Sequence, residues 1–200
     1  MLALVHQQPV GLPALIVLIG GLLWFFASFG RIRAGARGGG ETPAKKSNLS
    51  RWGVFIQMLG FASVGFGQVL IALPATSPLA LGEAAAVAAL MLLALGLFIA
   101  AARAMGANWA IVARLREGHE LVTSGVFAHL RHPIYTAMAC FLIAMATAFG
   151  HEYGLILGLP LFALGTGIRI REEEKLLRGE FGAAYDAYAA RVKRFVPGLI

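Results

Sequence analysis

The chain has 200 residues, of which 58% are hydrophobic and only 14% are charged, and its formal net charge is +7. This composition is too apolar for an ordinary soluble domain and indicates an integral membrane protein. The basic residues form no compact domain, which argues against nucleic-acid binding, and the single cysteine excludes an intrachain disulfide.

Five apolar runs follow one another along the chain. They are Val10–Phe29, Trp52–Leu73, Ala84–Ala102, Ile134–Phe149 and Tyr153–Ile168. The first three have about 20 residues each, enough to cross a hydrocarbon core of ~30 Å, whereas the last two need flanking residues to do so. Lipid offers no partners to backbone polar groups, so the runs are predicted to be helices. A soluble helical core is the alternative, but little polar sequence remains to cover it.

The basic residues predict how the chain crosses the membrane. All 17 Lys and Arg residues lie between runs one and two, between runs three and four, or after run five. The amino terminus and the links Pro74–Gly82 and Gly150–Glu152 carry none. The positive-inside rule then predicts an external amino terminus, five spans and a cytosolic carboxyl terminus. We expect a multi-pass protein of a prokaryotic inner membrane, with anionic lipid headgroups near its basic face.

The fold class predicted is all-α, with five transmembrane helices and a C-terminal amphipathic helix. Residues 1–103 are predicted to form a three-span region with a cytosolic loop at 30–51, and residues 104–200 a second region made of a cytosolic loop, a two-span hairpin and the C-terminal amphipathic helix. The Pro-Ala-Thr-Ser-Pro link predicts that spans two and three form a hairpin, and spans four and five a second one. Gly150, Gly154 and Gly158 recur at four-residue spacing, which allows another helix to approach closely.

An amphipathic helix is predicted from about Arg171 to Arg194, ended by Pro197. Its apolar face follows steps of three and four residues: Leu177, Phe181, Tyr185, Tyr188, Val192 and Phe195. Such a helix could lie on the membrane surface or cover a site at the cytosolic mouth of the spans, and the two are compatible.

Ionisable residues gather where two of the apolar runs meet polar sequence. Arg131-His132-Pro133-Ile134-Tyr135 precedes run four, and Glu172-Glu173-Glu174 follows run five. Charges at membrane depth are costly and mark a functional site, although a solvated charged face is the simpler explanation. Span four is predicted to begin at Pro133, which puts His132 and Tyr135 on its first turn. No metal site is predicted, because the spacing of His119, His132 and the glutamates matches no ligand pattern.

Three linked motifs resemble a known family. They are His119-x-Leu121-Val122-Thr-x-Gly125-x-Phe127, then Arg131-His132-Pro133-x-Tyr135, and then Glu173-Glu174-x-x-Leu177-x-x-x-Phe181-Gly182-x-x-Tyr185-x-x-Tyr188-x-x-x-Val192-x-x-Phe195-x-Pro197. This pattern, from about Gly106 to Pro197, resembles the isoprenylcysteine carboxyl methyltransferases. These membrane enzymes depend on S-adenosylmethionine and are related to the phospholipid N-methyltransferases.

The resemblance implies a set of site residues. Those expected to hold S-adenosylmethionine are His119, Glu120, Leu121, Val122, Phe127, His132, Pro133, Ile134, Tyr135 and Glu173. Arg169 is expected to face the carboxylate of the acceptor and to share the catalytic role with Glu173. Phe127 stands where the family usually has a tyrosine, so only stacking is expected there. A glutamine that contacts the cofactor in some members has no clear counterpart, and Arg114 is the nearest residue.

The function implied is methylation of a lipophilic or prenylated acceptor, with carboxyl O-methylation favoured. A carboxylate is already ionised at neutral pH, so the enzyme has to align it rather than deprotonate it. Phospholipid N-methylation is an alternative, and amine or thiol acceptors remain open, as does the oligomeric state. An NADPH-dependent sterol-type reductase shares the Arg-His-Pro-x-Tyr motif, and a non-enzymatic scaffold is a third possibility. The short five-span body and the Glu-Glu-x-x-Leu-x-x-x-Phe-Gly run favour methyl transfer.

Overall fold

The computed structural model describes residues 7–35, 45–46, 48–106, 114–115 and 121–195. These residues are mostly helical. The helices are α1 (Leu12–Gly35), α2 (Asn48–Gly65), α3 (Pro78–Met105), α4 (Pro133–Phe149), α5 (Leu155–Phe181) and α6 (Ala183–Arg191). The 3₁₀ turns Gly125–Ala128 and Glu152–Gly154 precede α4 and α5, and the short strands are β1 (Val10–Gly11), β2 (Lys45–Lys46), β3 (Ile71–Leu73) and β4 (Arg114–Leu115).

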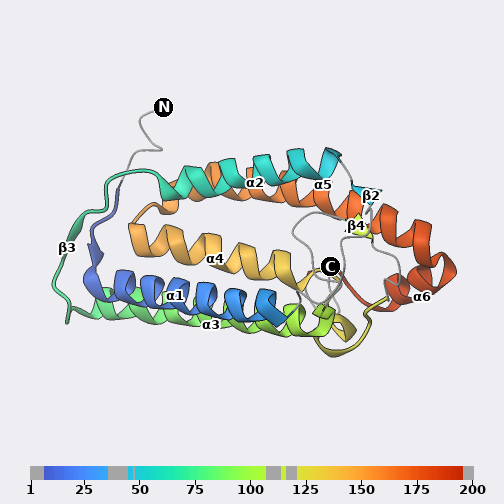
Figure 1. Cartoon of the computed structure of the whole chain (residues 1–200). Coiled ribbons are helices and arrows are strands. Elements are labelled where there is room, and N and C mark those ends of the chain that lie inside the picture. Colours follow the sequence, from blue (N-terminus) through green and yellow to red (C-terminus); the bar gives the residue numbers. More distant parts are fainter. Residues whose placement is uncertain (1–6, 36–44, 47, 107–113, 116–120, 196–200) are drawn as a thin grey trace.

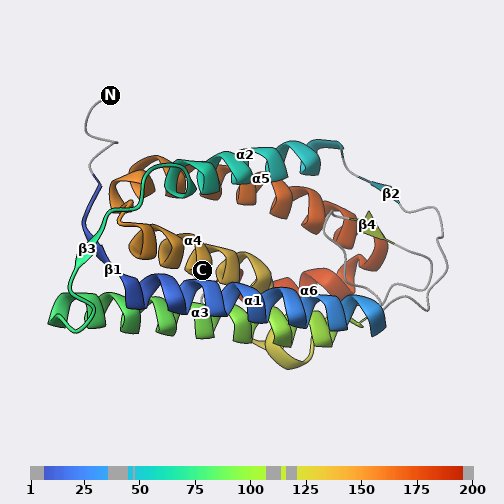
Figure 2. The ribbon, with the colours of Figure 1, turned by 60° about the vertical axis from the view of Figure 1, so that its left-hand side comes forward.

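The long helices form a bundle in which α4 lies between two helix pairs. In Figures 1 and 2, α1 runs beside α3, α2 runs beside α5, and α4 fills the middle. One core cluster joins α4 to α1 and α3 through residues such as Leu18, Val87 and Ala144, and another joins α4 to α2 and α5 through Val64, Leu142 and Phe162. The central helix therefore holds the bundle together.

Glycines bring α2 and α5 into close contact. A Cβ atom added to Gly60 would lie 2.9 Å from the carbonyl oxygen of Gly158, and one added to Gly154 would lie 2.5 Å from that of Ser63. These distances leave no room for a side chain, so the backbones meet directly. The predicted close approach at Gly154 and Gly158 is confirmed, and the partner helix is α2.

Three of the described helical segments are long and apolar enough to cross a membrane: Leu12–Ile32, Pro78–Met105 and Glu152–Phe181. Large apolar side chains on the outside of the bundle are exposed, including Leu23 (67%) and Ile156 (70%). Exposed apolar surface on this scale is expected where lipid replaces water as the solvent. The protein is thus an integral membrane protein built from helices.

Three predictions about the elements need correction. The run Trp52–Leu73 is not one helix, because α2 ends at Gly65 and Ile71–Leu73 forms β3, which pairs with β1 in parallel. The hairpin predicted for spans two and three does not form in the described part of the chain, since α2 packs against α5 and α3 packs against α1 and α4. The helix predicted from Arg171 to Arg194 is interrupted at Gly182, whose φ of 49° suits glycine and separates α5 from α6.

Candidate functional site

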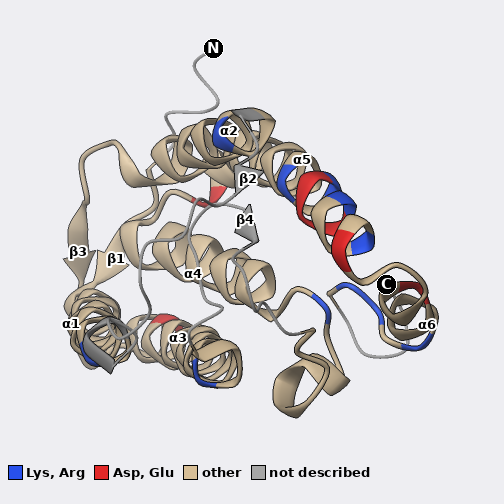
Figure 3. Cartoon of the chain, turned by 45° about the vertical axis from the view of Figure 1, so that its right-hand side comes forward, with Lys and Arg blue, Asp and Glu red and all other residues tan. Residues whose placement is uncertain are grey.

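Charged residues of the described chain gather toward one end of the bundle. Figure 3 shows them on the C-terminal half of α5, on α6 and on the segments beside them. α5 is apolar up to Ile168 and carries Arg169, Arg171 and the three glutamates from there on. One long helix therefore links the apolar bundle to its polar end.

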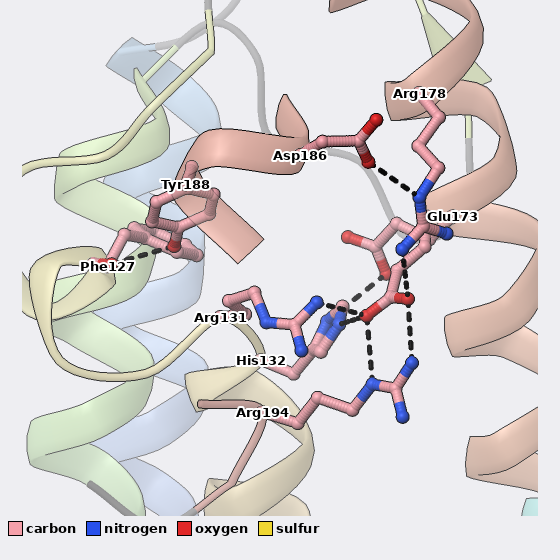
Figure 4. Close-up of polar contacts among 9 residues, drawn as sticks. Phe127, Arg131, His132, Glu173, Arg178, Asp186, Tyr188 and Arg194 are labelled. Carbon is pink, nitrogen blue, oxygen red and sulfur yellow. Dashed lines mark hydrogen bonds and ion pairs between the residues drawn. The ribbon is translucent and has the colours of Figure 1, made fainter. Parts of the chain in front are cut away.

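The carboxylate of Glu174 is the centre of an ionic network. Its Oε1 accepts hydrogen bonds from Nη1 of Arg131 (2.8 Å) and Nε of Arg194 (2.9 Å), and its Oε2 accepts one from Nη2 of Arg194 (2.8 Å). His132 Nε2 lies 3.2 Å from the same Oε1, and Arg178 adds a contact of 3.5 Å to Oε2. Figure 4 shows these side chains converging from α5, from the start of α4 and from the segment after α6.

The network ties the C-terminal segment to the start of α4. The backbone N–H groups of Arg131 and His132 donate to the carbonyl oxygens of Lys193 (2.8 Å) and Arg194 (3.0 Å). Hydrogen bonding to Glu174 raises the pKa of the Arg194 guanidinium, so this contact is charged throughout the physiological range. Backbone and side-chain bonds together fix α6 over the polar end of the bundle.

A small pocket lies beside this network. It has a volume of about 60 Å³ and is lined by Met105, Leu121, Val122, Phe127, Arg131, His132, Glu173, Leu177, Tyr185 and Tyr188. Aromatic faces and a carboxylate are the groups that attract an organic cation, so the chemistry of the lining suits a sulfonium cofactor. The volume is far below the ~300–1,000 Å³ of typical ligand pockets. As described, this pocket is smaller than a nucleoside-sized molecule requires.

Two tyrosines of α6 close one side of the pocket. The hydroxyl of Tyr188 donates a 2.7 Å hydrogen bond to the carbonyl oxygen of Phe127. Burial raises the pKa of Tyr188 to about 12, so the hydroxyl keeps its proton and remains a donor. Burial and the charge of Glu174 also raise the pKa of Tyr185. Phe127, which itself has no hydroxyl, is thereby held by its backbone.

A second group of side chains connects the pocket to the apolar bundle. The hydroxyl of Tyr135 donates to Oε2 of Glu173 (3.2 Å), and Nδ1 of His132 lies 3.9 Å from the same oxygen. On the other side, the guanidinium carbon of Arg169 lies 5.0 Å from the centre of the Tyr135 ring, a cation–π contact. Arg169 is one helical turn before Glu173 on α5, on the side of the apolar bundle.

The structure brings together several of the residues that the resemblance pointed to. Leu121, Val122, Phe127, His132 and Glu173 line the pocket, and Tyr135 is bonded to Glu173. Pro133 and Ile134 form the first turn of α4, which begins at the proline as predicted, but they do not line the pocket. His119 and Glu120 lie outside the described residues, and so does the side chain of Arg114.

Other contributors were not selected from the sequence. Glu174 and Arg194 form the ionic network, and Tyr185 and Tyr188 line the pocket. The two tyrosines belong to the apolar face predicted for the C-terminal helix. The three- and four-residue spacing of that face could therefore have identified them. Gln57 of α2, which accepts a hydrogen bond from Arg169 (2.7 Å), has no such signal.

Comparison with known proteins identifies the region that carries this site. Residues 86–179 match the model of the isoprenylcysteine carboxyl methyltransferase (ICMT) family. The matched segment contains α4, most of α3 and α5, and with them Phe127, His132, Tyr135, Arg169 and Glu173. The resemblance read from the sequence motifs is confirmed over this segment, and it supports a membrane methyltransferase. A comparison with curated proteins gave no match.

Proposed function

We propose that the protein is an S-adenosylmethionine-dependent methyltransferase that esterifies the carboxylate of a lipophilic, isoprenylcysteine-like acceptor. The observation that carries the proposal is the arrangement of His132, Tyr135, Glu173 and Arg169 within the matched segment. His132 and Glu173 line a pocket with aromatic walls, Tyr135 is hydrogen-bonded to Glu173, and Arg169 lies one turn deeper in the bundle. A polar cofactor and an apolar acceptor would then approach from opposite sides of Tyr135.

In this proposal His132, Tyr135 and Glu173 hold the cofactor. S-adenosylmethionine would supply the methyl group of its sulfonium to a carboxylate oxygen in line, with S-adenosylhomocysteine as the leaving group. Glu173 presents a carboxylate that is 33% exposed, and the hydroxyl of Tyr135 fixes its orientation. The side chain of His132 is only 2% exposed and is anchored by Glu174, so it forms a rigid wall. His119, Glu120, Leu121, Val122 and Phe127 are proposed to complete the cofactor site.

Arg169 is proposed to bind the carboxylate of the acceptor. A guanidinium presents a planar set of donors that matches a carboxylate. Tyr135 supports one face of it by stacking, and Gln57 takes one of its hydrogen bonds. Such pairing would orient the nucleophilic oxygen without a proton transfer, which is what an already ionised acceptor requires.

The proposal includes a five-span topology with the site on the cytosolic side. α2 and α4, with 18 and 17 residues, are shorter than the three candidate spans. At 1.5 Å per residue each reaches roughly 26 Å, so both need flanking residues to cross the ~30 Å core. Their packing inside the bundle supports this topology. The segment containing α6 would lie at the membrane surface and cover the pocket.

Cofactor preference tests the proposal directly. The purified protein in detergent is titrated separately with S-adenosylmethionine and with NADPH, and binding is measured by calorimetry. We expect binding of S-adenosylmethionine and transfer of its labelled methyl group to N-acetyl-S-farnesylcysteine. Binding of NADPH but not of S-adenosylmethionine would refute the methyltransferase proposal and indicate a reductase. Binding of neither would indicate a non-enzymatic scaffold.

Replacement of Arg169 tests the assignment of the acceptor group. Arg169→Ala should bind S-adenosylmethionine nearly as the wild type does, because cofactor contacts are assigned to other residues, but it should lose most methyl transfer to the farnesylated acid. Arg169→Lys should restore only part of it, since an ammonium lacks the planar donor set. Arg171→Ala, an exposed arginine two residues away, is the matched control. Full activity of Arg169→Ala would refute carboxyl methylation through Arg169.

A further inference from the structure

Gln57 is a buried amide in the middle of α2. Its side chain is almost completely enclosed, with the residue 1% exposed. Burying an amide is unfavourable unless its polar atoms are hydrogen-bonded, so a residue of this type inside an apolar bundle calls for specific partners. α2 lies outside the segment that matches the methyltransferase family, which begins at residue 86.

The two ends of the amide have different partners, both on α5. Oε1 accepts a 2.7 Å hydrogen bond from Nη1 of Arg169, and Nε2 donates a 2.7 Å hydrogen bond to Oγ1 of Thr166, which is 3% exposed. A guanidinium has only donors, so the amide oxygen has to face it. The bond to Thr166 keeps the amide from turning over. Gln57 therefore holds one particular edge of the guanidinium.

The backbone around this contact cannot easily shift. A Cβ atom on Gly53 would lie 2.5 Å from Cγ of Arg169, and one on Gly165 would lie 2.6 Å from the carbonyl oxygen of Gly53 and 2.8 Å from Cγ of Gln57. The helices thus touch directly on both sides of the hydrogen bond. With Gln57 at one edge and the ring of Tyr135 5.0 Å from its carbon, the guanidinium is confined between α2 and α4.

An amide holds a guanidinium without neutralising it. A carboxylate in the same position would also accept the hydrogen bond, but it would supply the negative charge that an anionic acceptor is meant to provide. Two carboxylates competing for one guanidinium repel each other, and in a low-dielectric surrounding this repulsion is large. The choice of glutamine at position 57 is therefore informative about the charge of the ligand.

We propose that Gln57 is a positioning residue that fixes the guanidinium of Arg169 for an anionic, carboxylate-bearing acceptor and makes the site discriminate the acid from its uncharged ester. This inference rests on the proposed function, because it assigns the acceptor to Arg169. It extends the site beyond the matched segment to α2. The N-terminal part of the chain thereby contributes to the choice of acceptor as well as to the bundle.

The test compares binding of N-acetyl-S-farnesylcysteine and of its methyl ester to the full-length protein in detergent. The wild type should bind the acid at least tenfold more tightly than the ester. Gln57→Glu, which is nearly isosteric, should reduce this preference to less than twofold, and Gln57→Leu should reduce it at least fivefold. Both variants should bind S-adenosylhomocysteine within twofold of the wild type, and the KM for the acid should rise more than kcat falls.

Ser63→Ala is the matched control. Ser63 joins α2 to the 3₁₀ turn directly before α5, by a 3.2 Å hydrogen bond from its hydroxyl to the carbonyl oxygen of Gly154, but it lies away from Arg169. It should keep the preference for the acid. The inference is overturned if both Gln57 variants keep the wild-type preference, or if the wild type binds acid and ester equally. A wild type that discriminates acid from ester yet transfers no methyl group would refute the proposed function and leave the role of Gln57 standing.

Discussion

Glu173 and Glu174 are neighbours in sequence but face different surroundings. An α-helix turns by about 100° per residue, so adjacent side chains point in different directions. The carboxylate of Glu173 is 33% exposed and lies at the pocket, whereas that of Glu174 is 2% exposed and is enclosed by Arg131, His132 and Arg194. This difference suggests that Glu173 is available to a ligand and that Glu174 holds the site together.

Cofactor affinity should depend on His132 and Glu173. His132→Ala removes a wall of the pocket and Glu173→Gln removes its carboxylate charge, so each should weaken S-adenosylmethionine binding at least tenfold, or about 1.4 kcal/mol. Calorimetric titration of both variants measures this. Glu180→Gln, an exposed glutamate on the same helix, should bind normally. Unchanged affinity in both site variants would mean that Glu173 is only a solvated charge.

Loss of the Glu174 carboxylate should destabilise the polar end of the bundle. Glu174→Gln leaves the guanidinium of Arg131, 11% exposed, facing an amide instead of a carboxylate. Breaking one side of a buried ion pair costs about 3–5 kcal/mol, although Arg194 is nearly half exposed and can turn toward water. We expect a clearly lower midpoint of thermal unfolding in detergent than for Glu180→Gln. Equal midpoints would show that the network contributes little to stability.

Sequence reasoning reached some of these residues and missed others for a physical reason. His132 stands out because it is an ionisable residue directly before the proline at which a membrane helix is predicted to begin. Glu174 does not stand out. It differs from Glu173 only in the face of α5 on which it lies, and which face is buried depends on how α5 packs. Gln57 is separated from Thr166 by 109 positions and from Arg169 by 112, so only the packing of α2 on α5 reveals the contact.

At the scale of the elements, α5 combines two functions. Its first half packs against α2 through glycines, and its second half carries the ionisable residues of the site. The register between α2 and α5 therefore determines where Arg169 lies. A change in this register would move the guanidinium relative to Tyr135 even though no site residue is altered.

Adding a methyl group at Gly165 should disturb this register. In Gly165→Ala the new Cβ would lie 2.6–2.8 Å from backbone and side-chain atoms of α2, so the helices must separate. Overpacking of this kind costs roughly 1–3 kcal/mol. Gly167→Ala is the matched control because a Cβ there meets nothing within 4 Å, and alanine is the better helix former. We expect a lower unfolding midpoint and lower methyl transfer for Gly165→Ala alone; identical behaviour of the two variants would contradict the packing argument.

The positions of the helices along the sequence were easier to predict than which helices pack against one another. α4 begins at Pro133 and ends at Phe149, as the apolar run and the proline indicated. The run Trp52–Leu73 misled because hydrophobicity does not distinguish a helix from the strand β3 that follows it. The break at Gly182 depends on a single backbone conformation, and the periodicity of the apolar face continues across it.

At the scale of the whole molecule, the bundle has an apolar middle and one strongly charged end. Figure 3 shows acidic and basic residues together on the second half of α5 and on α6. The other end contains β1 and β3. Their pairing provides hydrogen-bond partners for some of the backbone N–H and C=O groups between the helices. A site at the charged end would meet a water-soluble cofactor, while the flanks of the helices meet lipid.

The proposed topology puts the link between α1 and α2 on the cytosolic side and the link between α2 and α3 on the external side. All 17 basic residues fall on the side assigned to the cytosol, and this asymmetry sets the orientation of membrane proteins. The native Cys140 is partly buried in α4 and is first replaced by alanine. Single cysteines are then introduced at Ser47 and at Thr76, and intact cells are treated with a membrane-impermeant thiol reagent. We expect Thr76→Cys to be labelled in intact cells and Ser47→Cys only after the membrane is opened. Labelling of both from the same side would refute the five-span arrangement, because α2 would then not cross the membrane.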